Sequence, residues 1–304
     1  MIAFELCILG SGSAIPSPKR MASAQLLTYG KHHFLIDCAE GTQLQLRILK
    51  ISPMRIGSIF ISHLHGDHYF GLMGLLNSLH LIGRTEVLHL FGPSLLADII
   101  RIQLDASQTK LRFPLVFHAL QADEKQLIME TDFMEIYSFP VSHRIPTWGF
   151  LFQEKQCEPN IRHDFIERFH PDLTTILQIK CGADFTDGQG QLHINEELVS
   201  FRKCRSYAYC TDTAFHPPIA DLVKGASLLY HETTFMENQS SRAKETFHST
   251  TLDAARMASL AQVDKLLIGH FSSRYPDPEI LLDEVKTIFP NAIAAIDGLK
   301  IFIE

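Results

Sequence analysis

The chain has 304 residues, of which 46% are hydrophobic and 20% charged, a composition typical of a globular protein with a sizeable core. Its formal net charge of −7 argues against a surface coated in positive charge that binds any nucleic acid, although a local basic patch is compatible with it. No stretch approaches the roughly 18 consecutive apolar residues of a membrane span, and no secretory signal is evident. The six cysteines lack framework spacing, which indicates reduced thiols and a cytoplasmic protein.

Apolar segments separated by turn residues predict alternating strands and helices in the first half of the chain. The strand Phe4–Leu9 enters a turn rich in Gly, Ser and Pro, and two further strands form a hairpin around Gly30. The elements that follow are a helix near Thr42–Leu49, strand Ile59–Ser62, a helix near Tyr69–Leu79, strand Val87–Phe91 and helix Leu95–Asp105.

The middle of the chain has a different pattern. Strands at Leu115–Ala119, Leu127–Glu130 and Phe133–Phe139 are expected to form a meander, and residues 154–205 have the weak periodicity of an insertion. Alternation then returns with strands Ser206–Cys210, Ser227–Tyr230 and Lys265–Ile268, helices from Thr250 and over Pro278–Phe289, and strands near Ile293–Ile296 and Lys300–Ile303. This order predicts a layered α/β domain with an insertion.

The sharpest motif is His63-Leu64-His65-Gly66-Asp67-His68, directly after a buried strand and before a helix. This H-x-H-x-D-H pattern arises by chance in only roughly a few chains per thousand. Zinc is bound by imidazole and carboxylate groups, and these side chains cannot all reach one tetrahedral ion that has further ligands. The motif therefore predicts two adjacent metal ions, with a histidine-rich polar loop as the alternative.

Three other candidate ligands, His143, Asp212 and His270, each come just after a predicted strand. Taken singly, each is equally well explained as a capped strand end or a surface side chain. Sites in α/β folds gather beyond the C-terminal ends of strands, so the shared position favours one common site. The 16 histidines, many for a chain of this length, agree with such a site.

These residues, in this order, resemble the metallo-β-lactamase superfamily, and more closely its ribonuclease Z branch, whose members trim tRNA 3′ ends. The metal motif indicates only the superfamily. The finer resemblance rests on segments across nearly the whole chain: Leu9–Pro16, Leu35–Gln43, Ser62–His68, His231–Phe235, His248–Thr250 and Gly269–Tyr275.

The resemblance implies an αβ/βα four-layer sandwich, with residues 1–304 as a single domain and an inserted arm at approximately 154–205 that serves as a substrate-binding exosite. It implies a zinc-dependent endoribonuclease that removes the 3′ trailer from precursor tRNA, with no membrane partner. Because members of the branch commonly pair so that the arm of one subunit serves the other's site, a homodimer is also expected.

Carried over position by position, the resemblance implies two Zn²⁺ per chain. One ion is assigned to His63, His65 and His143, the second to Asp67, His68 and His270, with Asp212 bridging both. Asp67 is also expected to accept the proton of the attacking water. Asp37 matches a motif that supports the metal loop, so it is expected to be a buried hydrogen-bonding partner rather than a ligand.

The same resemblance assigns residues to the substrate. His248, oriented by Glu232, is expected to be the general acid for the ribose leaving group, with a capping or surface role as the alternative. Arg274 is expected to bind the scissile phosphate, because guanidinium matches phosphate oxygens bidentately, with a surface salt bridge as the alternative. Lys19 and Arg20 lie in a loop expected near the substrate's 3′ end, where two solvated charges in a turn are an equal alternative.

Two segments depart from the family pattern. Residues 154–205 contain no Gly-Pro pair, and their seven Lys and Arg against nine Asp and Glu make a poor clamp for RNA phosphates. The segment Arg144–Phe150 also lacks the usual Ser-x-Gly-Tyr. These departures bear on tRNA docking and leave the predicted metal chemistry unchanged.

Two other functions fit parts of the sequence. Another hydrolase of the superfamily, acting on small phosphodiesters, arylsulfates or thioesters, shares the metal motif but has no need of Arg274 or of the segments around Glu232 and His248. A non-catalytic RNA-binding subunit is expected to have lost metal ligands, whereas every predicted ligand position is filled here.

Overall fold

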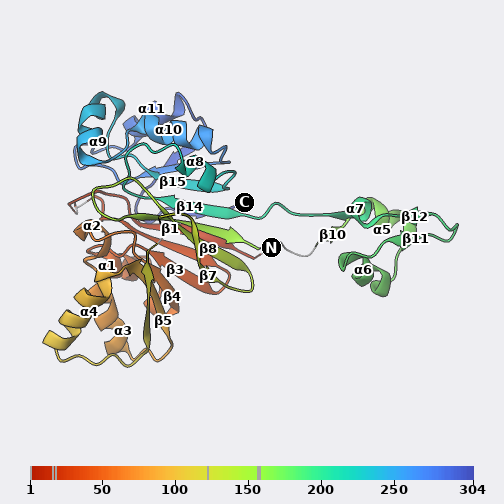
Figure 1. The fold of residues 1–304 in the computed structure, drawn as a ribbon, viewed down its shortest axis with the longest axis horizontal. Helices are drawn as coiled ribbons and strands as arrows, with labels where there is room; N and C mark the ends of the chain where they lie inside the picture. The colour runs from red at the N-terminus through yellow and green to blue at the C-terminus, as the bar shows by residue number, and fades with distance from the viewer. Residues whose placement is uncertain (1, 16, 18, 122, 156–158) are drawn as a thin grey trace. The chain divides into compact units, whose positions relative to one another are not determined.

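Two seven-stranded sheets form the framework of the computed structural model, which describes residues 2–15, 17, 19–121, 123–155 and 159–304 (Figure 1). The first sheet has the order β18 (Lys300–Phe302), β1 (Phe4–Gly10), β2 (Ala24–Tyr29), β3 (His32–Ile36), β4 (Ile56–Phe60), β5 (Leu88–Pro93) and β6 (Leu115–Leu120). The second has the order β17 (Ala292–Ala294), β16 (Leu266–Gly269), β15 (Leu228–Glu232), β14 (Ser206–Cys210), β9 (Trp148–Glu154), β8 (Met134–Pro140) and β7 (Gln126–Glu130).

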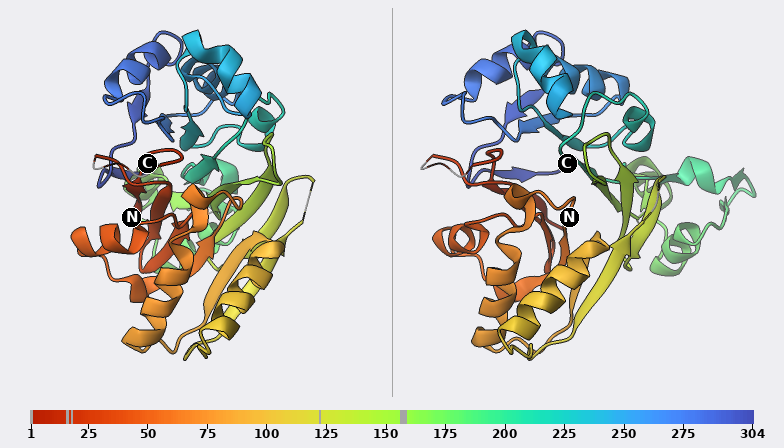
Figure 2. Two further views of the ribbon diagram at one scale, coloured as in Figure 1. Left: turned by 90° about the vertical axis from the view of Figure 1, so that its left-hand side faces the viewer. Right: turned by 60° about the vertical axis from the view of Figure 1, so that its left-hand side comes forward.

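Helices cover the outer face of each sheet (Figure 2). The first sheet is covered by α1 (Thr42–Ile48), α3 (Leu72–Ile82) and α4 (Leu95–Ala106), and the second by α10 (Thr251–Leu260) and α11 (Glu279–Lys286). In α3 the buried residues are Leu72, Leu75, Leu76 and Leu79, the spacing that places one apolar face against a sheet. The predicted αβ/βα four-layer sandwich is therefore confirmed.

Aromatic side chains fill the space between the two sheets. Phe60 of β4 lies 5.5 Å from Phe150 and 5.3 Å from Phe152 of β9, measured between ring centroids. Phe34 of β3 lies 5.8 Å from Phe152. All of these rings are buried, and burying a side chain of this size contributes about 1.5–3 kcal/mol. This packing holds the two sheets face to face.

The expected meander is wrong. The strand β6 pairs in parallel with β5 in the first sheet, whereas β7 and β8 are neighbours in the second. Alternating apolar and polar residues indicate that a strand has one buried face, but they do not indicate which strand it pairs with. The strand β9 was not predicted because it is buried on both faces and shows no alternation.

Two hydrogen bonds between Thr250 and Asp253 define the start of α10. Thr250 is the N-cap, its side chain accepts a hydrogen bond from the backbone of Asp253, and the Asp253 carboxylate accepts one from the backbone of Thr250. Thr250 and Asp253 therefore form a capping box. Shorter helices outside residues 153–205 are η1 (Pro53–Arg55), α2 (Gly66–Tyr69), α8 (Ile219–Leu222), η2 (Glu237–Gln239) and α9 (Ser240–Thr246).

Residues 131–135 and 153–205 form a second compact unit. Its elements are β10 (Asn160–Ile161), α5 (His163–Phe169), α6 (Leu173–Lys180), β11 (Phe185–Thr186), β12 (Leu192–His193), α7 (Asn195–Leu198) and β13 (Val199–Ser200). Phe165, Ile179, Leu198 and Val199 make its small core. The buried Glu154 carboxylate accepts hydrogen bonds from the backbone N (2.9 Å) and Nε (3.0 Å) of Arg205. These bonds join the first and last residues of the segment 154–205.

Among the described cysteines, Cys7, Cys38, Cys181 and Cys210 are free thiols, and Cys157 lies outside the described residues. Burial raises the pKa of the Cys7 thiol to about 11 and that of Cys38 to about 12. Both side chains are therefore unreactive thiols of the core. Within the described part of the chain, no helix has the length and apolar character needed to cross a membrane.

Candidate metal centre

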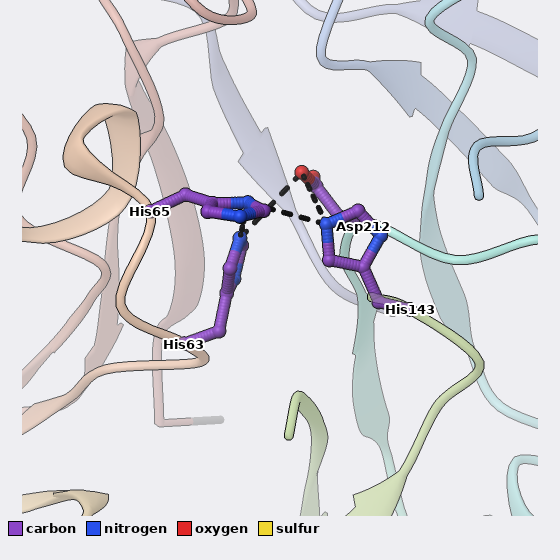
Figure 3. A group of neighbouring side chains, drawn as sticks. All are labelled: His63, His65, His143 and Asp212. Carbon is purple, nitrogen blue, oxygen red and sulfur yellow. Dashed lines mark hydrogen bonds and ion pairs between the residues drawn. The ribbon is translucent and has the colours of Figure 1, made fainter. Parts of the chain in front are cut away.

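The predicted ligands lie together at strand ends of both sheets. His63 and His65 follow β4, Asp67 and His68 lie in α2, and His143, Asp212 and His270 follow β8, β14 and β16. Because β4 runs parallel to β3, and β14, β15 and β16 run parallel to one another, their carboxyl ends present these side chains along shared sheet edges. Figure 3 shows His63, His65, His143 and Asp212 pointing toward one another.

The first cluster consists of His63, His65, His143 and one oxygen of Asp212. His65 Nδ1 lies 3.1 Å from His63 Nε2 and 3.2 Å from His143 Nε2. Asp212 Oδ2 lies 3.6 Å from His63 Nε2 and 3.9 Å from His143 Nε2. Ligand atoms at zinc distances of 2.0–2.1 Å in a tetrahedron lie about 3.3–3.4 Å apart, so these four atoms fit around one ion.

The second cluster consists of Asp67, His68, His270 and the other oxygen of Asp212. Asp212 Oδ1 lies 3.4 Å from His68 Nε2 and 3.2 Å from His270 Nε2. Asp67 Oδ2 lies 3.8 Å and 3.4 Å from the same two nitrogens. Each oxygen of Asp212 thus faces a different cluster, which is the arrangement of a carboxylate that bridges two cations.

Two buried nitrogen atoms of the second cluster show that the residues fit a metal. Among the described residues, His68 Nε2 and His270 Nε2 are buried without a hydrogen-bond partner. A buried polar atom left unpaired costs about 1–3 kcal/mol, and a cation between these nitrogens and the carboxylates removes that penalty. The donor set of imidazole and carboxylate suits a divalent ion.

The electrostatics favour the protonation states that metal binding requires at Asp212 and His63. At His68 they do not, because burial opposes the imidazolium but the Asp212 and Asp37 carboxylates outweigh it and raise its pKa well above the ordinary value, so this ring must lose a proton to bind metal. Burial works against the Asp212 carboxylate, but the neighbouring imidazoles of His270 and His68 hold its pKa well below its usual range. Burial lowers the pKa of His63 well below the ordinary value, and the His68 charge lowers it further. Ionised carboxylates and neutral imidazoles are the forms that bind metal.

The ring nitrogen of a ligand histidine that faces away from the cluster is held by a hydrogen bond, which fixes the ring orientation. The pairs are His63 Nδ1 with Ser62 Oγ (3.0 Å), His68 Nδ1 with Asp37 Oδ2 (2.7 Å), His143 Nδ1 with Phe247 O (2.9 Å) and His270 Nδ1 with Thr234 Oγ1 (2.9 Å). These partners preorganise the site before any metal enters.

Among these partners, Asp37 also binds groups other than the ligand histidine. Its buried carboxylate accepts hydrogen bonds from Ser62 N (2.8 Å), Ser62 Oγ (2.9 Å) and Tyr209 OH (2.7 Å), and it lies 2.7 Å from His68 Nδ1. The expectation of a buried hydrogen-bonding partner is confirmed. Its backbone φ of 55° is left-handed, a conformation that Asp tolerates better than most residues and that marks strained positions near functional sites.

Replacing Asp37 with alanine is expected to lower the free energy of unfolding by about 3 kcal/mol, because several buried donors lose their acceptor. Metal affinity is expected to fall about 10–100-fold, because His68 loses the group that orients it. Urea denaturation of the metal-free protein and metal titration measure the two effects. The exposed Asp98, which pairs with Arg101 at the surface, provides the matched alanine control. Equal stability of the two variants contradicts the prediction.

The structure also brings His248 and Glu232 together. His248 Nδ1 lies 2.8 Å from Glu232 Oε1, and the fully buried Glu232 carboxylate also accepts hydrogen bonds from the backbone of Thr213 (3.1 Å), Thr234 (2.9 Å) and Ser249 (3.0 Å). Burial disfavours the imidazolium form of His248, but the Glu232 and Asp212 carboxylates outweigh it and raise its pKa to about 9. In the metal-free protein this ring is therefore protonated at neutral pH.

A cavity of about 290 Å³ joins His248 to the metal ligands and is also lined by Arg274. The guanidinium carbon of Arg274 lies 5.6 Å from the centre of the Phe235 ring, a cation–π contact. Arg242 of α9 lines the same cavity and was not among the predicted site residues. In the sequence, only its position six residues before His248 suggests that Arg242 lies near the site. It belongs to no motif, so it resembles any charged residue on a helix surface.

Lys19 and Arg20 lie in the predicted loop but in different surroundings. Lys19 is exposed, whereas the half-buried Arg20 donates a hydrogen bond to the backbone carbonyl of Tyr275 and lies 5.7 Å from the Phe271 ring. Arg20 therefore ties its loop to the segment that carries Arg274. Phosphate binding by Lys19 and Arg20 stays a prediction.

The two joined clusters at the strand ends of an αβ/βα sandwich define a metal-dependent hydrolase of the metallo-β-lactamase fold. A family model described as anti-Pycsar protein Apyc1 matches residues 4–156, about half of the chain. Ribonuclease Z of Phocaeicola vulgatus is 43% identical over 100% of this chain and 99% of its own length, and ribonuclease Z of Parabacteroides distasonis is 41% identical over the full length of both. The crystal structure of human tRNase Z, short form, superposes with a TM-score of 0.73 at 28% identity over 99% of both chains. The chain belongs to the ribonuclease Z family of metal-dependent endoribonucleases.

Proposed function

We propose that the protein is a zinc-dependent endoribonuclease that removes the 3′ trailer from precursor tRNA. The observation that carries this proposal is the placement of Asp212 between two ligand clusters that open into the cavity of His248 and Arg274. His63, His65 and His143 would hold one zinc and Asp67, His68 and His270 the other. A bound pair of ions supplies a nucleophile at neutral pH and offsets negative charge on the phosphate.

The chain's own groups complete the chemistry. Asp67, whose carboxylate also accepts a hydrogen bond of 2.6 Å from the backbone of Ala14, takes the proton of the attacking water. Arg274 binds the non-bridging oxygens of the phosphate. A mature tRNA ends in a free 3′ hydroxyl, so the leaving group is the ribose 3′ oxygen. With Nδ1 held by Glu232, His248 donates the proton on Nε2 to that oxygen, and the phosphate stays on the trailer.

The test is cleavage of a precursor tRNA with a short 3′ trailer by the purified protein. About two zinc ions per chain, one cut at the tRNA–trailer junction, loss of cleavage after chelation and its return with Zn²⁺ are the expected results. The control is the chelated protein given Mg²⁺, an ion that prefers oxygen ligands to imidazole. Bound metal with turnover of bis(p-nitrophenyl) phosphate and an intact tRNA contradicts the proposal and favours a small-molecule phosphodiesterase.

The resemblance supports further proposals about assembly and location. Residues 154–205 are proposed as an arm that contacts the tRNA body, and their folding as part of a separate compact unit supports this role. Their excess of acidic residues argues that the contact does not rely on many phosphate pairs. A cytoplasmic homodimer, in which the arm of one subunit serves the other's site, follows from the same resemblance.

A further inference from the structure

A second cavity, of about 460 Å³, adjoins the metal centre. It shares Ala14, His65 and Asp67 with the cavity that contains His248 and is otherwise lined by different residues. Among the described residues these others are Ile15, Ala22, Glu40, Gly66 and Phe70. The metal centre therefore has a second opening, away from the general acid, that the proposed chemistry does not use.

Phe70 is the largest side chain of this second cavity and is 66% exposed. It directly follows α2 of the metal motif, and part of its ring lies over Gly66, where a Cβ would come within 2.3 Å of the ring atom Cε2. The absence of a side chain at Gly66 thus leaves the space that the ring occupies. Ile15, 71% exposed, lines the same cavity. Two large apolar side chains left in water beside an active centre indicate a surface that a ligand covers.

The charge of the second cavity identifies the kind of ligand. Apart from the metal ligand Asp67, Glu40 supplies the charge among the described lining residues, and its carboxylate is exposed. A phosphate is repelled by this carboxylate and gains nothing from an apolar wall. A nucleobase is uncharged, stacks on an aromatic ring and offers N–H groups that a carboxylate accepts.

The position of the second cavity identifies the nucleotide, and this step rests on the proposed function. His248 protonates the 3′ oxygen of the last tRNA nucleotide, so that nucleotide lies on the side of the first cavity. The phosphate stays on the first nucleotide of the trailer, whose base then lies beyond Asp67, away from His248. We propose that the second cavity binds the base of the first trailer nucleotide, stacked on Phe70, with an N–H of the base facing Glu40.

The test pairs a variant of Phe70 with removal of the base. Two precursor tRNAs are compared, one with a normal first trailer nucleotide and one abasic at that position. On the normal substrate, Phe70→Leu is expected to lower kcat/KM about tenfold through KM, which is within the loss seen when one stacking platform is removed. Phe70→Tyr, which keeps the ring face, is expected to restore it. On the abasic substrate, the wild-type protein and Phe70→Leu are expected to be equal.

A matched control is Phe302→Leu in β18, since Phe302 is 60% exposed but does not line the second cavity, and cleavage of both substrates is expected to be unchanged. Equal losses for Phe70→Leu on the two substrates, or no loss on either, overturn the base-binding role while wild-type cleavage still upholds the proposed function. Failure of the wild-type protein to cut the normal substrate overturns both.

Discussion

Replacing His248 with alanine is expected to lower kcat for precursor tRNA by about 10²–10⁴-fold, the usual contribution of general acid catalysis, and to leave the metal content unchanged. The two proposed ligand clusters do not include His248. Its Nδ1 is already held by Glu232, although the ring lies close to Asp212 and His270. The loss is therefore expected in the rate of the chemical step. Single-turnover cleavage and metal analysis of the same preparation measure the two quantities.

The exposed His216 provides the matched alanine control, with unchanged cleavage expected. If His248→Ala loses metal in proportion to its activity, the ring is a ligand and its assignment as the acid is wrong. If it cleaves at the wild-type rate, another group protonates the leaving oxygen. Only a fall in rate at constant metal content supports the role proposed for His248.

The pH dependence of cleavage is a second test of the role of His248. Burial opposes the imidazolium of His248, but Glu232 and Asp212 raise its pKa to about 9 in the metal-free protein. The acid is protonated below this pKa, so kcat declines as pH rises through it, and bound cations move the decline to lower pH. The pKa of His248 is higher in the folded protein than in the unfolded chain, so its ion pair with Glu232 stabilises the metal-free fold. This stabilisation is complete below the unfolded pKa of about 6.5 and is lost as pH rises through the folded pKa of about 9.

The gathering of the candidate ligands in one place could be predicted because it depends on local features. One loop and short helix contain His63, His65, Asp67 and His68. The other candidate ligands follow strands, and the end of a strand places a side chain at the edge of the sheet whichever strands lie beside it. What the sequence cannot specify is the atom that each side chain presents. His63 presents Nε2 and His65 presents Nδ1, a difference that depends on where Ser62 and His143 pack.

The features that were missed depend on contacts between distant parts of the chain. The pairing of β6 with β5 depends on the arrangement of the whole sheet. Arg242 lines the cavity only because α9 and the segments that carry Asp67 and His270 meet there. The second cavity likewise needs Ile15, Glu40 and Phe70 to meet from separate segments. Each of these residues has an ordinary surface role when taken alone, so no local pattern distinguishes it.

The substitution Asp212→Asn is expected to have the largest effect of any single change. In the native protein Oδ1 faces His68 and His270 while Oδ2 faces His63 and His143. An amide keeps one oxygen and turns an NH₂ group, which repels a cation, toward the other cluster. Metal content is expected to fall from about two ions per chain to one or fewer, and kcat/KM by about 10⁴-fold or more, because the activation of water depends on the metal.

The matched control is Asp98→Asn, which makes the same change at an exposed carboxylate and is expected to preserve both metal content and cleavage. Circular dichroism of the metal-free proteins separates loss of metal from loss of fold. Loss of one ion with a smaller drop in activity indicates that Asp212 serves a single cluster. Two retained ions with wild-type cleavage contradict the bridging role, because both clusters then bind metal without a charged oxygen from Asp212 beside His63 and His270.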